Sequence, residues 1–148
     1  MTQREEVRFK VYTKTRTQLS NIGVFPLELI DFIEGDGTYD TTNYRYIVQN
    51  AGTYLLGFSC NSGSNDKNSA HQITLDRIVD GVSTTRVINR GLLTFRAPNC
   101  SLNSCFMYKL EVGDELYIRE WWGRSLTVIS SYTSDDTLNS FWGIRLDY

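Results

Sequence analysis

The chain is poor in the residues on which most enzymes and metal sites depend. His71 is the only histidine, so a histidine-based metal cluster cannot form. The three cysteines, Cys60, Cys100 and Cys105, lack the spacing of a metal-binding motif, and no local pattern pairs one of them with His71 as nucleophile and base. His71 is therefore interpreted as a surface residue, and we expect no enzymatic activity.

Long apolar runs and a strong charge imbalance are also missing. No stretch approaches the ~20 apolar residues that a membrane-spanning helix needs. The net charge is −2, with basic and acidic residues interspersed. The chain thus has neither the basic patch of a nucleic-acid binder nor a polybasic membrane segment, so we expect no nucleic-acid partner and no membrane insertion.

The cysteines leave two alternatives open. Cys100 and Cys105 are close enough in sequence to close a small loop if their geometry allows it; the other alternative is that all the thiols are free. Cys60 continues the inward side of a predicted strand, which favours a small buried residue over a reactive one.

Strand-forming residues are what the chain has in abundance. Aromatic residues make up 13% of it, with nine Tyr and seven Phe, against two Pro and eleven Gly. Aromatic and β-branched residues favour strands. A length of 148 residues predicts a single domain, residues 1–148, large enough to fold without a metal or a disulfide framework.

Alternation with a period of two marks the individual strands. Phe9 and Val11 lie on one face of the first strand, and the strand that follows Gly52 alternates with large residues along one face. Asp80-Gly81 is the dipeptide of a tight hairpin turn. We find no helix of useful length, and eight to ten short strands at regular spacing predict an antiparallel sandwich or jelly roll.

Two further segments indicate which strands lie at the edge of a sheet and which lie inside it. The segment from Val24 to Phe32 is apolar but contains Pro26, which predicts an edge strand or an extended connection. The last strand has Trp142 and Ile144 on one face, followed by Leu146 and Tyr148. A strand that stays apolar to its end should not lie at an exposed sheet edge, so we place it centrally, beside the first strand.

Several anchor residues recur at the spacing of a known family. An aromatic residue is followed by six residues, a second aromatic, five residues, and Gly-x-Tyr-x-hydrophobic-x-aromatic. Two later motifs are Leu110 to Leu116, with Gly-Asp in the turn, and Asn139 to Ile144. Together these resemble the globular head domain of complement component C1q, within the tumour-necrosis-factor-like jelly rolls. The matching positions are Tyr39, Tyr46, Gly52, Tyr54, Phe58, Gly113, Asp114, Phe141 and Gly143.

The resemblance implies a fold, an assembly and a role. It implies an all-β, antiparallel, ten-stranded jelly roll of two sheets, a compact homotrimer with aromatic inner faces at its axis, and non-catalytic recognition outside the cell. The chain has no Gly-x-y repeat and therefore no collagen-like stalk. Met1 to Glu6 is polar, not a signal peptide. We predict a secreted protein, with a cytosolic one as the alternative.

The unusual polar and aromatic segment is Arg119-Glu120-Trp121-Trp122-Gly123-Arg124. Adjacent Trp residues in a strand point to opposite faces. An exposed Trp flanked by Arg suits sugar stacking, carboxylate pairing or a protein contact. We therefore predict that Arg119, Trp121, Trp122 and Arg124 bind a ligand. The alternative places one Trp in the core and the other at the seam of a trimer.

Metal and modification sites are weaker candidates. Asp135 and Asp136, or Asp36 and Asp40, offer the hard oxygen ligands that calcium prefers, although their spacing matches no calcium loop. No cofactor is expected otherwise. Asn99-Cys100-Ser101 is a glycosylation acceptor if the chain is secreted.

The functional prediction is a non-enzymatic, trimeric recognition module that binds carbohydrates or microbial surfaces, as a lectin-like or pattern-recognition protein of innate immunity. Its partners would be two further copies of itself and a glycan or protein ligand. One alternative is a signalling ligand for a cell-surface receptor, like the tumour-necrosis-factor relatives. The other is a trimeric tip or adhesin on a viral or bacterial fibre.

Overall fold

The computed structural model describes residues 6–13, 17–19, 24–61, 70–78, 85–94, 101–120, 126–128 and 139–146. These residues form two five-stranded antiparallel sheets and one small two-stranded sheet, and they contain no helix. The strands are β1 (Arg8–Tyr12), β2 (Thr17–Leu19), β3 (Leu29–Glu34), β4 (Thr38–Asp40), β5 (Arg45–Ile47), β6 (Gly52–Asn61), β7 (Ala70–Ile78), β8 (Thr85–Thr94), β9 (Ser101–Leu110), β10 (Glu115–Glu120), β11 (Leu126–Val128) and β12 (Ser140–Arg145).

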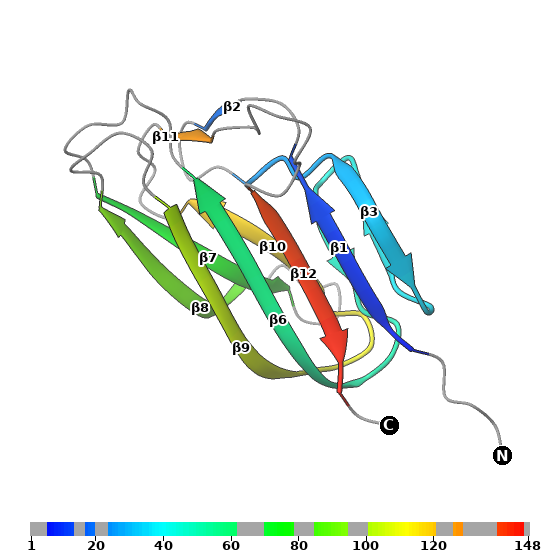
Figure 1. Ribbon diagram of the computed structural model, residues 1–148. Coiled ribbons are helices and arrows are strands. Elements are labelled where there is room, and N and C mark those ends of the chain that lie inside the picture. The colour runs from blue at the N-terminus through cyan, green and yellow to red at the C-terminus, as the bar shows by residue number, and fades with distance from the viewer. Residues whose placement is uncertain are drawn as a thin grey trace, which may run out of the picture.

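The two large sheets pack face to face (Figure 1). The front sheet has the strand order β3-β1-β12-β6-β9 and the back sheet β4-β5-β10-β7-β8, while β2 pairs with β11 at one end of the sandwich. Strands distant in sequence are neighbours in both sheets, which is the arrangement of a jelly roll. The predicted all-β jelly roll of two antiparallel sheets is confirmed.

The position of the last strand is also as predicted. β12 lies between β1 and β6, with Phe9 opposite Gly143 and Leu56 on its other side. β3 forms one edge of the front sheet, and Pro26 lies in the connection before it. The predicted hairpin turn at Asp80-Gly81 lies outside the described residues, although β7 and β8, which flank it, pair antiparallel.

Aromatic side chains from both sheets form the centre of the core. Phe9 of β1 stacks on Tyr46 of β5, with ring centroids 3.7 Å apart and planes inclined by 16°. Phe141 of β12 meets Phe9 edge-on at 5.0 Å. Tyr54 and Phe58 of β6 are fully buried. The period-two face of β6 therefore points into the protomer core and not toward a trimer axis.

The turn between β9 and β10 closes one end of the sandwich. Gly113 has a φ of 91°, a conformation that favours glycine, and its amide donates to the carbonyl of Val48 at 2.8 Å. The Asp114 carboxylate accepts the Glu111 amide at 2.7 Å and pairs with Arg77 at 2.6 Å. The Asp114 side chain is 1% exposed, so this turn is fastened to β7 by an ion pair inside the molecule.

Candidate interaction face

The outer face of the front sheet, on the side away from the back sheet, carries an aromatic surface. Strand register places Phe32, Lys10, Trp142, Gly57 and Cys105 in one row across all five strands. Because partners in antiparallel register point to the same side of a sheet, these side chains share the outer face. We call this surface the front face.

A second row runs beside the first. It consists of Glu34, Arg8, Ile144, Leu55 and Met107. Met107 is 66% exposed, and its neighbours on alternate positions of β9, Cys105 and Lys109, are exposed as well. The front face thus combines apolar and aromatic side chains with charged groups at its edges.

Trp142 stands at the centre of the front face. A Cβ atom added to Gly57 would come within 2.3 Å of Cε2 and Cζ2 of the indole. Trp142 therefore lies against the β6 backbone, where only glycine leaves room for it. This close approach explains a glycine inside a strand whose neighbours are large residues.

A hollow lies on each side of the Trp142 indole. One, of about 390 Å³, is bordered by Arg8, Lys10, Phe32 and Ile144 together with Trp142. The other, of about 350 Å³, is bordered by Ser59, Asn103 and Cys105 with the same indole. We call the first the Phe32 hollow.

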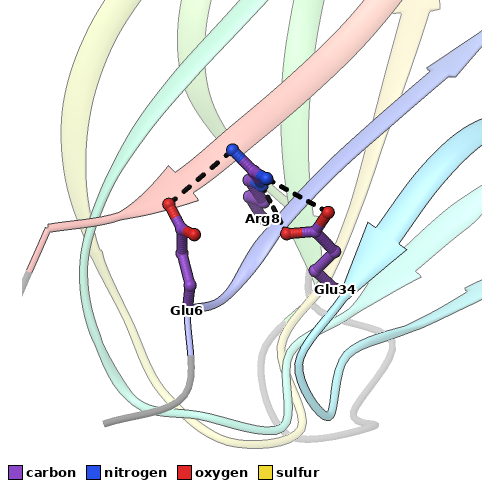
Figure 2. A network of polar contacts seen from close by, with 3 residues as sticks. All are labelled: Glu6, Arg8 and Glu34. Carbon is purple, nitrogen blue, oxygen red and sulfur yellow. Dashed lines mark hydrogen bonds and ion pairs between the residues drawn. The ribbon is translucent and has the colours of Figure 1, made fainter. Parts of the chain in front are cut away.

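Charged groups at the β3 edge of the front face are already paired (Figure 2). The Arg8 guanidinium donates to both carboxylate oxygens of Glu34, at 2.5 and 3.1 Å, and lies 3.7 Å from the Glu6 carboxylate. The hydrogen bond between Arg8 and Glu34 raises the pKa of Arg8 and lowers that of Glu34. Arg8 also lies 5.6 Å from the Phe32 ring centre, so the pair fastens edge strand β3 to β1.

The structure places only one of the four predicted ligand-binding residues. Arg119 lies on β10 of the back sheet, where its guanidinium pairs with the buried Asp76 and lies 5.9 Å from the Tyr117 ring centre. Its side chain is 15% exposed. Trp121, Trp122 and Arg124 lie outside the described residues, so ligand binding by this group stays a prediction.

The family-motif residues make contacts inside the protein. The Tyr39 hydroxyl donates to the Leu27 carbonyl at 2.8 Å, and the Tyr54 hydroxyl donates to the Asn50 carbonyl at 2.7 Å. Gly143 packs against Phe9, and an added Cβ would lie 2.5 Å from that ring. Burial raises the pKa of the Tyr39 hydroxyl. The aromatic motif residues belong to the core cluster or pack against it: Tyr39, Tyr46, Tyr54, Phe58 and Phe141.

The remaining candidates are the four aspartates predicted as calcium ligands. The structure describes two of them, Asp36 and Asp40. Asp40 accepts the amides of Thr42 at 2.8 Å and Asn43 at 3.2 Å, and hydrogen bonding, first from the Asn43 side chain, lowers the pKa of Asp40. Asp36 accepts from Asn50 at 3.4 Å. Asp135 and Asp136 lie outside the described residues, so calcium binding there stays a prediction.

Cys105 resolves part of the cysteine question. Its thiol is free and exposed and borders the smaller hollow of the front face. Cys100 and the side chain of Cys60 lie outside what the structure describes. The free-thiol alternative therefore holds for Cys105.

Comparison with known proteins supports the fold alone. No known family model matches the chain, and no curated protein sequence matches it. Among solved structures, an Eiger TNF from S. frugiperda has a TM-score of 0.81 at 14% identity, covering 97% of this chain and 94% of the other. Murine APRIL at pH 5.0 has a TM-score of 0.72 at 14% identity, covering 95% and 99%. The same protein at pH 8.5 has a TM-score of 0.67 at 15% identity over the same shares.

These comparisons refine the family resemblance. The chain has the same jelly-roll fold as these tumour-necrosis-factor-like structures. Membership of the C1q family in particular finds no support from a family model. Within the described residues no helix has the length and apolar character needed to cross a bilayer.

Proposed function

We propose that the protein is a non-enzymatic, extracellular ligand that assembles as a homotrimer and binds a protein receptor on a cell surface. The front face is the observation that carries this proposal, as the surface on which copies of the chain meet. It presents an indole, a phenyl ring and an exposed methionine together on one side of a sheet, and apolar groups concentrated in this way mark a protein contact. Trp is also the side chain most enriched among residues that dominate binding energy.

Fold and sequence motifs support the same function. The solved structures with this fold include a protein named as a TNF, and the motif spacing resembles trimeric recognition domains. Three copies in one particle present three equivalent receptor sites, so weak single contacts add up to strong binding on a cell. This proposal takes the signalling-ligand alternative ahead of the lectin-like one.

A second candidate function is carbohydrate recognition, as the Arg119 to Arg124 segment predicts. One described feature is compatible with it, because the smaller hollow sets the Trp142 indole beside the Asn103 amide and the Ser59 hydroxyl. Aromatic rings combined with amide and hydroxyl groups are a common way to hold a sugar. Sugar binding in this hollow and self-assembly through the front face exclude each other, because self-assembly would cover the hollow.

Binding to intact cells tests the receptor proposal. The labelled full chain is applied to cells that each overexpress one surface protein, and the same cells are treated with glycosidases in parallel. A receptor ligand binds saturably to cells expressing one particular protein, and the signal survives removal of the glycans. Binding that follows glycan content across all the cells, and that disappears after glycosidase treatment, would contradict the proposal and favour the lectin-like function.

A further inference from the structure

Met107 has the most exposed large hydrophobic side chain among the residues that the structure describes, at 66% exposure. It lies on β9, at the opposite edge of the front sheet from β3, and it is the only methionine within the described part of the chain. Oxidation converts the flexible apolar side chain of methionine into a polar sulfoxide. At Met107 this change takes place on the front face and not in the core.

The side chains that follow Met107 across its row of the front face are hydrocarbon. Leu55 of β6 is its cross-strand partner, and Ile144 of β12 lies opposite Leu55. Neither side chain can donate a hydrogen bond. A polar oxygen on Met107 that is covered together with these two residues therefore loses its water without gaining a partner from them, which costs free energy.

The β3 edge of the front face differs in this respect. The Phe32 hollow is bordered by Arg8 and Lys10, and each of these cations already pairs with a carboxylate of β3. Polar groups at that edge thus have partners inside the chain. The residues around Met107 offer apolar contact instead, so a change of polarity has its larger effect at the β9 edge.

Oxidation of Met107 leaves the single chain folded. The exposed thioether makes few contacts with its own chain, so a sulfoxide at this position stays in water. The residues that hold the two sheets together, such as Phe9, Tyr54 and Phe141, are buried in the core and are not affected. The same sulfoxide is desolvated in an assembly that covers the front face. The modification therefore acts on assembly and not on folding.

We infer that Met107 is an oxidation site that regulates assembly, and that its sulfoxide weakens the contact between copies without unfolding the chain. The inference rests on the self-assembly in the proposed function and names its regulation. The oxidant is hydrogen peroxide. The thioether sulfur loses two electrons and gains an S–O bond, while the O–O bond of the peroxide breaks and water leaves. Assembly in turn protects the sulfur, because the coupling between the two events is reciprocal.

Peroxide treatment followed by sedimentation tests this regulation directly. The full chain is oxidised with hydrogen peroxide, and peptide mass spectrometry measures the fraction of sulfoxide at position 107. The concentration of half-assembly is measured before and after the treatment. We expect oxidation to raise that concentration by about tenfold and to leave the melting temperature unchanged. Met107→Leu, compared with its own untreated sample, should show no such rise.

Cys105 requires a control of its own, because its thiol is also free and exposed and lies two residues along β9 from Met107. Dithiothreitol alone reverses the oxidation of thiols to disulfides or sulfenic acids but leaves the sulfoxide. Methionine sulfoxide reductases A and B, supplied with dithiothreitol, also reduce the sulfoxide. We expect assembly to recover only when the reductases are present. Recovery with dithiothreitol alone would assign the effect to a thiol and overturn the inference.

The outcomes separate this inference from the function on which it rests. A chain that is monomeric at micromolar concentration before oxidation contradicts both. A chain that assembles equally well with position 107 fully oxidised contradicts the inference alone.

A matched pair of substitutions gives a readout that needs no oxidant. Met107→Gln places a polar group of similar length at the oxidation site, whereas Val112→Gln places it on the 53% exposed Val112 of the β9–β10 turn. We expect Met107→Gln to weaken assembly and Val112→Gln to leave it unchanged, with equal melting temperatures for the two variants. Equal assembly by both would overturn the inference.

Discussion

Replacing Tyr46 by Phe should stabilise the protein, although it removes a polar group from a tightly packed core. Tyr46 is fully buried, and its hydroxyl has no hydrogen-bond partner among the residues that the structure describes. The hydroxyl lies over Gly37, where an added Cβ would come within 1.8 Å of the oxygen. The ring itself stacks on Phe9, and phenylalanine would keep that contact.

The expected gain follows from the cost of an unsatisfied group. Leaving a buried hydroxyl without a partner costs about 1–3 kcal/mol, and losing the contacts of one oxygen atom offsets part of that. We expect Tyr46→Phe to raise the free energy of unfolding by about 1 kcal/mol. For a chain of this length that corresponds to a rise of about 2–4 °C in melting temperature.

The matched control is Tyr54→Phe, on β6 in the opposite sheet of the same core. Its hydroxyl donates to the Asn50 carbonyl at 2.7 Å, so its removal should lower stability by about 1 kcal/mol. Urea unfolding at neutral pH, followed by circular dichroism, measures both variants against the parent chain. If Tyr46→Phe is destabilised as much as Tyr54→Phe, the Tyr46 hydroxyl has a partner and the reasoning is refuted.

Three other predictions test separate parts of the molecule. Burial raises the pKa of Tyr46, so stability should fall above pH ~10, where the unfolded tyrosine ionises first, and Tyr46→Phe should lessen that fall in pH-dependent unfolding. Asp114→Asn leaves Arg77 buried without its anion, so urea unfolding should show a loss of about 3 kcal/mol; a loss under 1 kcal/mol would contradict this. Gly57→Ala should displace Trp142, costing about 1–3 kcal/mol and shifting the tryptophan emission, while an unchanged spectrum would refute the close packing.

The fold could be predicted from the sequence because the alternation of large side chains and the spacing of the motif residues both indicate a jelly roll. The aromatic residues of β6 alternate in a single phase, so Tyr54 and Phe58 identify the inward face, although Leu55 is in the opposite phase. Phe141, Trp142 and Ile144 make both faces of β12 apolar, and the strand lies in the middle of a sheet as predicted. Alternation and motif spacing can still be recognised at 14% identity to the solved structures, where few individual residues are the same.

The front face could not be predicted from the sequence in the same way. Both faces of β12 are apolar, with Phe141 on one and Trp142 on the other, so alternation cannot tell which side faces the core. Register with β6 decides it, because Gly57 lies opposite Trp142 and makes room for the indole. The Arg77–Asp114 pair likewise depends on strands far apart in sequence. The ligand segment predicted from Trp121 and Trp122 remains a prediction.

Sedimentation equilibrium of the full chain at micromolar concentration tests the central claim most directly, with Trp142→Lys and Val112→Lys measured beside it. We predict a mass three times the 17.0 kDa of one chain for the parent and for Val112→Lys, and the mass of a single chain for Trp142→Lys. A parent chain that stays monomeric would contradict the proposed assembly. A Trp142→Lys variant that is folded and fully trimeric would contradict the assignment of assembly to the front face.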